Sequence, residues 1–390
     1  MEKVRYGVIG IGAMGHKHAL KISKGRDKNA QLTAVCDIAE DRRVWAKDKL
    51  GECSIFENYM DLINAPNVDA VIVATPHYYH PEIAIAALKA NKHVLCEKPA
   101  GVYTKAVREL NSVAESKPEL VFGIMYNQRT NPLYKYAKEL ISSGELGDIK
   151  RINWIITNWY RPQAYYDQGG WRGTWSGEGG GVLINQCPHQ LDIFWWLAGL
   201  PTRIRGYCKA GVNRKINVEN DVTIYTEYAS GASGVFVTST HDSPGTNRLE
   251  IDANCGKLVI EQNLLSEKLT FYRLKTRESV FNTINTKFMP RIHCSREVKR
   301  TNFIQNAYRL GIKGQHLNII QNFSEAILKG ETLIAPGVDG INGLTISNAA
   351  YLSTWLNEDI ELPLDEDLFL SELEKRVDTE NSSIDVKGEK

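Results

Sequence analysis

The sequence predicts an α/β protein with two domains: an N-terminal Rossmann domain with a doubly wound parallel sheet, and a C-terminal α/β domain with a large, mostly antiparallel open sheet. Three observations lead to this class. Short β-branched runs alternate with helical patterns over the first part of the chain, a glycine turn follows the first run, and β-rich segments dominate later. In addition, 390 residues are more than one hydrophobic core usually serves.

The N-terminal elements follow at βα spacing. A strand, a glycine turn and a helix are expected within residues 4–22, and continuous apolar runs predict further strands within 30–37, 69–76, 92–99 and 119–127. Helical patterns lie between them, at 41–50, 80–91 and 103–116. Continuous apolar strands are typical of a sheet that helices cover on both faces.

The pattern changes near residue 126. A helix within 131–147 is followed by β-rich segments at 149–160, 202–211, 221–240, 247–262 and 267–274, and then by helices within 316–330 and 343–358. The stretch "YASGASG" reads as a hairpin tip. We therefore expect an NAD-binding Rossmann domain over 1–125, a substrate-binding α/β domain over 126–363, and a charged C-terminal helix and tail over 364–390.

Composition excludes several classes of partner. The formal net charge of +1 favours neither nucleic acid nor an anionic membrane surface, and no apolar run approaches the length of about 20 residues that crosses a bilayer. The strand that begins within three residues of Met1 leaves no room for a signal peptide. Seven scattered cysteines without a CxxC pair predict reduced thiols in a cytoplasmic protein, and neither a metal site nor a disulfide framework.

A dinucleotide site is predicted at the first strand. Gly10, Gly12 and Gly15 form GxGxxG: the first permits a tight turn, the second lets the backbone approach a pyrophosphate, and the third lets helix and strand pack closely. Ala13 and Met14 complete this turn at the helix N-terminus, where N–H groups and the helix dipole favour phosphate.

The cofactor is expected to be NAD. Asp37 ends the second strand, where an acidic residue accepts hydrogen bonds from the adenosine ribose and repels a 2′-phosphate. NADP remains a secondary interpretation because Arg42 and Arg43 follow closely.

The predicted strands within 69–76 and 92–99 end at the same edge of the sheet, the carboxyl edge at which ligands bind in such folds. Thr75, Pro76 and His77 should line the cofactor groove there, with His80, although both histidines could be helix-entry residues without a catalytic part. Glu97 and Lys98 follow a buried strand, where unpaired charges are costly, so each needs a partner or a task. A local ion pair is the plainer alternative.

Four ordered motifs carry a family resemblance: "GIGAMG", "ATPHYYHP", "KHVLCEKPAG" and "GGGVLINQCPHQLDIFWWLAG". Together they resemble the glucose-fructose oxidoreductase, inositol dehydrogenase and rhizopine catabolism (Gfo/Idh/MocA) family over residues 4–355. The resemblance implies NAD(P)-linked oxidation or reduction of a sugar or cyclitol hydroxyl. It further implies that Lys98 touches nicotinamide and substrate, and that Glu97 lies near the nicotinamide ribose.

The resemblance also implies that His189 is the acid–base residue. A neutral imidazole can take a hydroxyl proton while the Lys98 ammonium stabilises the developing alkoxide. The spacing of Asn185, His189 and Asp192 predicts one helical face. Asp192 could partner His189 or cap local structure. Inositol dehydrogenase-like members of the family carry an aspartate at the position of Asn185. The asparagine makes this chain look closer to members that oxidise a C3 hydroxyl.

Substrate contacts are expected from two segments. Tyr126, Asn127 and Arg129 follow the fifth strand at the ligand edge. The aromatic segment 154–175 holds four of the eight tryptophans, whose rings can pack on sugar C–H faces, and from it we select Tyr160, Arg161 and Trp175. Alternate aromatics in a strand could instead pack a core.

The sequence therefore predicts an NAD-dependent dehydrogenase that oxidises a ring hydroxyl, C3 in the first instance, of a sugar or glycoside. The alternatives are an NAD-retaining enzyme that cleaves glycosides through transient C3 oxidation, an inositol or cyclitol dehydrogenase, and a non-enzymatic NAD sensor. By analogy with similar proteins we expect a homodimer or homotetramer.

Overall fold

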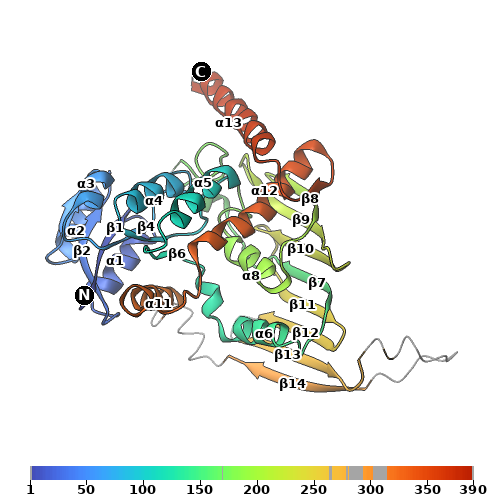
Figure 1. The fold of residues 1–390 in the computed structure, drawn as a ribbon. Coiled ribbons are helices and arrows are strands. Elements are labelled where there is room, and N and C mark those ends of the chain that lie inside the picture. Colours follow the sequence, from blue (N-terminus) through green and yellow to red (C-terminus); the bar gives the residue numbers. More distant parts are fainter. Residues whose placement is uncertain are drawn as a thin grey trace. The chain divides into compact units, whose positions relative to one another are not determined.

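The computed structural model describes residues 2–168, 170–262, 266–277, 280, 293–301 and 314–388. The chain divides into two compact units (Figure 1): the first holds residues 1–130, 177–179 and 313–344, and the second holds 131–176, 180–312 and 345–390. This division departs from the linear one expected at residues 125 and 363, because a late segment returns to the first unit and the C-terminal helix belongs to the second. Residues 389–390 of the expected tail lie outside the described residues.

The first unit contains a six-stranded parallel sheet, as the sequence predicts. Its strands are β1 (Val4–Ile9), β2 (Ala30–Cys36), β3 (Ser54–Phe56), β4 (Ala70–Val73), β5 (His93–Cys96) and β6 (Phe122–Ile124), in the order β3-β2-β1-β4-β5-β6. Every residue of β4 is buried, which explains its continuous apolar sequence. The sequence interpretation missed β3, whose three residues are too short for a periodic signal.

Helices cover both faces of this sheet. They are α1 (Gly15–Ser23), α2 (Glu40–Lys49), α3 (Tyr59–Asn64), α4 (Tyr79–Lys89), α5 (Thr104–Glu115) and α11 (Gln315–Lys329), with the 3₁₀ turns η1 (Asn127–Thr130) and η2 (Gly337–Asp339). Figure 1 shows α4 and α5 side by side on one face and α1 and α11 on the other. The late helix α11 is held to β1 by the hydroxyls of Tyr6 and Ser324, which lie 2.8 Å apart and are both buried.

The second unit is built on a nine-stranded sheet. Its strands are β7 (Ile149–Ile156), β8 (Arg203–Ala210), β9 (Glu219–Glu227), β10 (Ser233–Ser239), β11 (Asn247–Ala253), β12 (Gly256–Gln262), β13 (Glu267–Leu274), β14 (Cys294–Arg300) and β15 (Ile360–Glu361), in the order β14-β13-β12-β11-β7-β10-β9-β8-β15. The β7–β10 pair is parallel and the other pairs are antiparallel. The expected hairpin tip joins β9 to β10.

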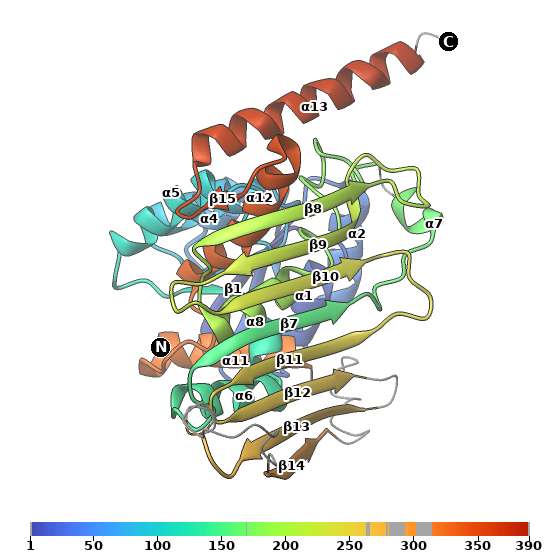
Figure 2. The same cartoon turned by 90° about the vertical axis from the view of Figure 1, so that its right-hand side faces the viewer.

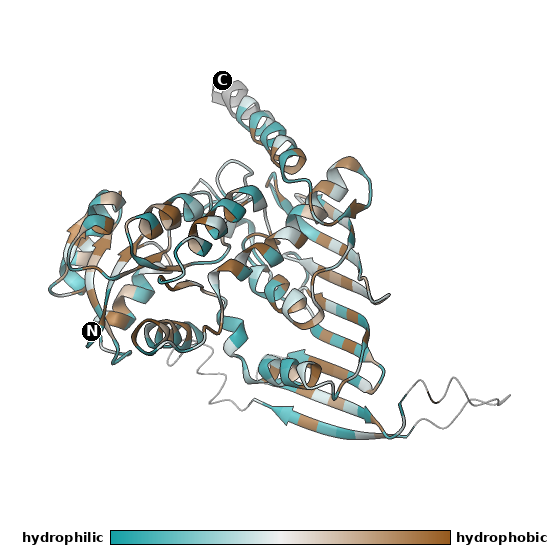
Figure 3. Cartoon of the chain, viewed as in Figure 1, coloured by the Kyte–Doolittle hydropathy of each residue, from teal (hydrophilic) through white to brown (hydrophobic). Residues whose placement is uncertain are grey.

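The helices of the second unit are α6 (Pro132–Ser142), α7 (Gln163–Tyr166), α8 (Pro188–Ala198), α12 (Gly340–Leu356) and α13 (Glu366–Gly388), and α12 runs from one unit into the other. Of these, α6, α8 and α12 lie on one face of the sheet, whereas α13 extends away from it (Figure 1). Along β7 the side chains alternate: Trp154 and Ile156 are fully buried, whereas Ile155 between them is 44% exposed. Figure 2 looks onto the face of the sheet that the helices leave uncovered, and Figure 3 shows the alternation of apolar and polar residues along the strands.

Among the described residues, no helix combines the length and apolar character that a membrane crossing requires. In the same part of the chain, no three His, Cys, Asp or Glu side chains are grouped as a metal site would need. All seven cysteines are free.

Candidate active site

The glycine turn after β1 has the geometry that a dinucleotide needs. Gly10 has a φ of +82°, and a Cβ there would lie 2.7 Å from the Ala74 carbonyl oxygen. A Cβ on Gly15 would lie 1.8 Å from the Gly10 carbonyl oxygen, which explains the close approach of α1. At Gly12, in contrast, a Cβ would meet nothing within 4 Å. Space is therefore left over the backbone at the position expected to face a pyrophosphate.

The helix that follows leaves its N-terminal end open. Met14 is the N-cap residue of α1 and makes no side-chain capping bond. His16 uses its Nδ1 atom on the Gly12 carbonyl oxygen, 2.7 Å away. The N–H groups of His16 and Lys17 already donate to the carbonyl oxygens of Gly12 (3.3 Å) and Met14 (2.9 Å). What this end of α1 offers an anionic group is therefore the helix dipole and the turn before it, which includes Ala13.

Asp37 lies at the carboxyl end of β2, as predicted. Its Oδ2 atom accepts a hydrogen bond from the Ile11 backbone N–H at 2.8 Å, and its Oδ1 atom accepts one from the Ala39 N–H at 3.0 Å. The carboxylate is therefore tied to the glycine turn. Arg43 donates to the carbonyl oxygens of Asp37 and Ile38 and pairs with Glu57 at 3.1 Å.

The residues that follow β4 form a second place where a ligand could bind. The Oγ1 atom of Thr75 is buried and has no hydrogen-bond partner among the described residues. Pro76 beside it is exposed, and the His77 Nδ1 atom lies 3.0 Å from the Glu178 carbonyl oxygen. An orphaned hydroxyl at the ligand edge of the sheet, together with the open space at Gly12, fits a bound dinucleotide.

His80 connects the ends of two strands. Its Nε2 atom lies 2.7 Å from the Thr75 carbonyl oxygen, and its Nδ1 atom lies 2.7 Å from the Pro99 carbonyl oxygen. Burial lowers the pKa of His80, against the two carbonyls, which favour the doubly protonated ring. The side chain is 1% exposed and fastens the loop after β5 to the loop after β4.

Glu97 is a buried carboxylate with a partner that the sequence interpretation missed. Its Oε1 atom lies 2.6 Å from Nε2 of His18, and its Oε2 atom accepts the Lys98 backbone N–H at 3.1 Å. Burial by itself would raise the pKa of Glu97, but the hydrogen bond from His18 and the neighbouring positive charges hold it well below its usual range. The carboxylate is therefore ionised.

A second histidine lies against this pair. The ring centroids of His18 and His316 are 5.7 Å apart, and the Asn127 amide nitrogen lies 3.2 Å from Nδ1 of His316. Burial lowers the pKa of His316 to about 4, so its ring is neutral and can accept from Asn127.

Tyr126 and Arg129, two expected substrate contacts, are buried in the first unit. Arg129 is 1% exposed and its Nη1 atom lies 2.7 Å from Oδ2 of Asp339. Tyr126 is 2% exposed and donates to the Gly340 carbonyl oxygen at 3.4 Å. These contacts fasten η1 to η2, and we do not carry the two residues into the proposed substrate contacts.

In the second unit, a buried carboxylate holds the glycine-rich turn before α8. Glu219 of β9 accepts hydrogen bonds from the backbone N–H groups of Gly181 (2.8 Å) and Leu183 (2.9 Å) and from the Tyr351 hydroxyl (2.7 Å). A Cβ on Gly181 would lie 1.9 Å from the Glu219 carbonyl oxygen. Only glycine therefore lets the turn sit against β9.

Asn185 does not share a helical face with His189, contrary to the expectation from spacing. It lies in a turn, with its N–H bonded to the Gly181 carbonyl oxygen at 2.9 Å, because α8 begins only at Pro188. His189 is the second residue of α8. Asp192 is fully buried and accepts a hydrogen bond from the Trp195 indole at 3.1 Å.

Exposure separates the predicted catalytic residues from their neighbours. Within residues 94–102 only Lys98 is partly exposed, and within 178–194 only Asn185 and His189 are. In each unit a closely packed segment thus leaves partly exposed the side chains that the sequence singled out.

The aromatic segment contributes one exposed ring and one buried one. Tyr160 is 49% exposed, and the Arg214 guanidinium lies 5.2 Å from its ring centroid. Trp175 is 7% exposed, crosses the rings of Tyr351 and Trp355 edge to face at 5.3 and 5.4 Å, and donates to a backbone carbonyl. Trp175 is therefore core in this structure, and we leave it out of the proposed substrate contacts.

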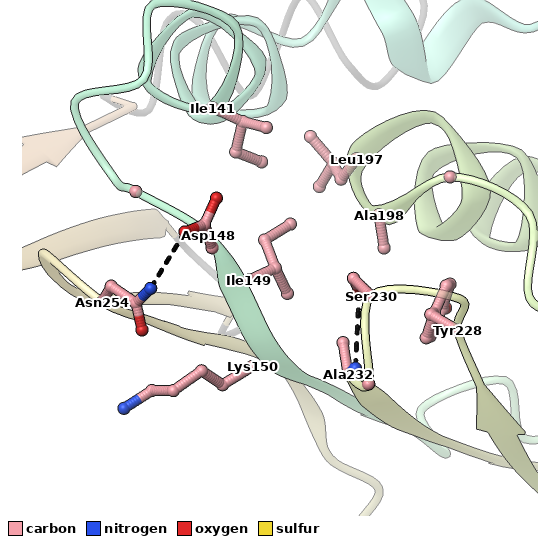
Figure 4. Close-up of a pocket in the computed structure, with 13 residues that line it drawn as sticks. Ile141, Asp148, Ile149, Lys150, Leu197, Ala198, Tyr228, Ser230, Ala232 and Asn254 are labelled. Atoms are coloured by element: carbon pink, nitrogen blue, oxygen red, sulfur yellow. Dashed lines mark hydrogen bonds between the residues drawn. The ribbon is translucent and has the colours of Figure 1, made fainter. Parts of the chain in front are cut away.

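A hollow of about 830 Å³ in the second unit contains none of these residues (Figure 4). It lies between Ile141 of α6, the end of α8 at Leu197, and the β9–β10 hairpin. His189 is at the opposite end of the 11-residue helix α8, about 12 Å from Leu197 along its axis. The hollow is therefore separate from the candidate site.

Two family models match the chain. One is described as the oxidoreductase family with NAD-binding Rossmann fold and matches residues 4–124. The other is the GFO/IDH/MocA C-terminal domain and matches residues 134–259. The chain belongs to the Gfo/Idh/MocA family. Its first unit is an NAD-binding Rossmann domain, and the protein is an NAD-linked oxidoreductase of this sugar and cyclitol dehydrogenase family.

Individual relatives agree with this family. The chain is 28% identical over 260 residues to a myo-inositol 2-dehydrogenase of Thermotoga maritima, which covers 65% of this chain and 74% of that enzyme. Alignments with several other inositol 2-dehydrogenases, such as that of Salmonella typhimurium, span about half of those enzymes (54%).

Solved structures share the fold. The WlbA dehydrogenase of Bordetella pertussis, in complex with NADH and UDP-GlcNAcA, has a TM-score of 0.74 at 23% identity over 93% of this chain and 100% of that one. A levoglucosan dehydrogenase in complex with NADH and L-sorbose has a TM-score of 0.75 at 19% identity over 93% of this chain and 100% of that one.

Proposed function

We propose that the chain is an NAD-dependent dehydrogenase that oxidises a ring hydroxyl of a sugar or glycoside to a ketone, with the C3 hydroxyl as the first candidate. One observation carries the proposal. In two otherwise buried segments, residues 94–102 and 178–194, the side chains left partly exposed are Lys98 in the first unit and Asn185 and His189 in the second. In the oxidation of a carbinol an imidazole can take the hydroxyl proton, an ammonium can stabilise the developing alkoxide, and an amide can orient the hydroxyl.

The proton chemistry is assigned to this chain's own residues. Bound NAD supplies the acceptor for the hydride that leaves the carbinol carbon. A neutral His189 imidazole takes the hydroxyl proton, and the Lys98 ammonium stabilises the negative charge that develops on the substrate oxygen. Glu97, whose pKa is held well below its usual range, stays ionised directly before Lys98 in the chain.

Asn185 favours a sugar over an inositol. An amide can orient a hydroxyl but cannot ionise, so it cannot relay a proton as a carboxylate would. The names of relatives and neighbours include inositol, a nucleotide sugar and levoglucosan, so the substrate class is a polyhydroxylated ring. Tyr160, which is half exposed, and Arg161 are the proposed contacts from the aromatic segment. Asn127 of the first unit is buried, but its Oδ1 atom has no hydrogen-bond partner among the described residues, so it stays a proposed contact.

We propose NAD rather than NADP as the cofactor because the Asp37 carboxylate, tied to the Ile11 N–H, would repel a 2′-phosphate. Asp37→Ala should weaken NAD binding more than NADP binding, as measured by titration of each cofactor. If NADP binds more tightly than NAD to the unaltered protein, the cofactor assignment is wrong.

The test of the activity is NAD⁺ reduction, followed at the absorbance of NADH, over hexoses, glycosides, nucleotide sugars and inositols, with NMR of the product to locate the ketone. Lys98→Ala and His189→Ala should each abolish turnover and leave NAD affinity nearly unchanged; full activity in either variant contradicts the mechanism. Aglycone release without NADH accumulation would identify the NAD-retaining, glycoside-cleaving alternative, and oxidation of inositol alone would identify a cyclitol dehydrogenase.

We also propose a cytoplasmic homodimer or homotetramer. The free cysteines support a reducing compartment. Tyr207, Tyr225 and Ile155 are 41–52% exposed on the sheet of the second unit and support an association surface there. Light scattering after size exclusion measures the assembly, and a monomer at all concentrations contradicts this part of the proposal.

A further inference from the structure

The hydroxyl oxygen of Tyr165 collects hydrogen bonds from two separate segments of the second unit. Tyr165 lies in the short helix α7. Three donors lie within hydrogen-bond distance of its Oη atom: Nη1 of Arg172 at 2.7 Å, Nδ2 of Asn185 at 3.2 Å and Nε2 of Gln186 at 3.3 Å. The two lone pairs of the hydroxyl oxygen are shared among them. The aromatic segment and the turn before α8 are thereby joined at one atom.

The ring of Tyr165 is held independently of its hydroxyl. The guanidinium carbons of Arg161 and Arg172 lie 5.1 and 4.7 Å from the ring centroid, and the Tyr166 ring crosses it edge to face at 5.1 Å. These cation–π and aromatic contacts depend on the ring face and edge. A phenylalanine would retain them, so removal of the hydroxyl alone is a clean change.

The bond to Asn185 bears on the proposed chemistry. Asn185, in the turn before α8, and His189, in the first turn of α8, are the partly exposed residues within 178–194. The contact between its Nδ2 atom and the Tyr165 hydroxyl holds the Asn185 side chain in place, and so fixes the direction from which its amide meets a substrate hydroxyl. A carboxylate at position 185 would have to accept from the Tyr165 hydroxyl instead.

We propose that Tyr165 is a positioning residue for the reaction: its hydroxyl fixes the Asn185 amide, and through that amide the substrate hydroxyl that His189 deprotonates. The inference rests on the proposed function, since Asn185 and His189 obtain their roles there. It explains why a chain with asparagine at this position also carries a tyrosine surrounded by arginines in its aromatic segment.

The kinetic test compares Tyr165→Phe with Tyr166→Phe. Loss of the hydroxyl should lower kcat about tenfold, with a smaller change in KM, while NAD affinity and Tm stay near those of the unaltered enzyme. Tyr166 is the matched control because its hydroxyl is 2.8 Å from Oγ1 of buried Thr240 instead; Tyr166→Phe should lower Tm and leave kcat unchanged. An unchanged kcat in Tyr165→Phe overturns the proposal.

A double-mutant cycle separates positioning from general structural support. Because Tyr165 acts through Asn185, Tyr165→Phe should add little to the loss already caused by Asn185→Ala. Fully additive losses in kcat contradict the proposal.

An NMR measurement tests the contact between Tyr165 and Asn185 independently of the proposed function. With ¹⁵N-labelled asparagine, the side-chain amide signal of Asn185, assigned by its absence in Asn185→Ala, should shift and exchange faster with solvent in Tyr165→Phe but not in Tyr166→Phe. If the unaltered protein oxidises no polyol, the proposed function and the kinetic role fail together, while this signal still decides whether Tyr165 holds the amide. An unshifted signal overturns the contact itself.

Discussion

The Nε2 atom of His18 lies 2.6 Å from Oε1 of Glu97, and both side chains are buried. One comes from the helix after the glycine turn and the other from the end of β5, so a single hydrogen bond joins two parts of the predicted cofactor site. Because Glu97 precedes Lys98 directly, this bond also fixes the start of the loop that carries the proposed catalytic lysine.

His18→Ala should destabilise the protein by about 3–5 kcal/mol, because it leaves the Glu97 carboxylate buried without its partner. The double variant His18→Ala/Glu97→Gln should lose less than the sum of the two single variants, since it removes the isolated charge as well. Denaturant unfolding measures all three. Additive losses would show that the pair contributes no coupling.

The same pair predicts a pH dependence. The folded-state pKa of Glu97 lies well below its ordinary value of 4.5, so its stabilising contribution is present above that value and is lost as the pH falls through the folded pKa. The difference in Tm between the unaltered protein and Glu97→Gln should therefore shrink as the pH is lowered below about 4.5. A difference that grows on acidification contradicts the assignment.

Substitutions at the second and third glycines of GxGxxG, Gly12 and Gly15, should have different effects: one on cofactor binding and the other on stability. At Gly12 an added Cβ meets nothing within 4 Å, whereas at Gly15 it would lie 1.8 Å from a backbone oxygen. We expect Gly12→Ala to keep its Tm and to lose NAD affinity at least tenfold, because the methyl group occupies space proposed for the pyrophosphate. Gly15→Ala should instead lower Tm by several degrees. Unchanged NAD binding in Gly12→Ala would place the pyrophosphate elsewhere.

Glu219 predicts a pH dependence of the opposite sign. Burial raises the pKa of this carboxyl from 4.5 to about 7, against the opposing hydrogen bonds from Leu183, Tyr351 and Gly181. Glu219 therefore contributes about 3 kcal/mol to the free energy of unfolding at low pH. This contribution is complete below about pH 4.5 and is lost as the pH rises to about 7. Tyr351 and Cys208 are titratable groups that interact with Glu219, and burial raises the pKa of both, so both are neutral in this pH range.

Relative to Glu219→Gln, the unaltered protein should therefore become less stable between about pH 4.5 and 7, as measured by chemical denaturation at each pH. Tyr351→Phe removes a hydrogen bond that lowers the pKa of Glu219, so it should move this transition to higher pH. Parallel curves for the unaltered protein and Glu219→Gln contradict the shift.

The C-terminal helix should stabilise the aromatic segment. Glu380 of α13 accepts hydrogen bonds from the Trp175 N–H (3.1 Å), the Ser176 N–H (2.9 Å) and hydroxyl (2.7 Å), and the Asn217 amide (2.7 Å). Glu380→Ala should lower the stability by about 2 kcal/mol or more and speed hydrogen exchange at 171–176, because several buried donors lose their acceptor. Glu374→Ala, on an exposed position of the same helix, is the control. Equal exchange in the two variants contradicts this role.

Local patterns were enough for much of the first unit. The alternation of apolar runs with helical segments predicted five of its six strands, and GxGxxG with Asp37 predicted the turn and the strand end that the structure confirms. Such features depend on residues close in the chain, whose backbone preferences act at short range. The three-residue β3 carried no period long enough to detect.

Long-range partners could not be predicted in the same way. His18 with Glu97, Tyr165 with Asn185, and Glu380 with Ser176 are 79, 20 and 204 residues apart, and nothing at either position announces the other. The helix-face expectation for Asn185 was wrong because spacing alone does not reveal where a helix begins; Pro188 at the first helical position and the glycines before it would have been the better signal.

The sequence by itself determined the order of elements, the dinucleotide turn, the family, and the identity of Lys98 and His189 as candidate catalytic residues, because each depends on short motifs with fixed local geometry. Only the tertiary structure decided which charges are buried and what holds them, and therefore that Trp175 and Arg129 are packing residues and that Glu219, Glu380 and Tyr165 hold the loops. The physical reason is that burial and hydrogen-bond pairing arise when distant segments meet, and a linear pattern does not contain that distance.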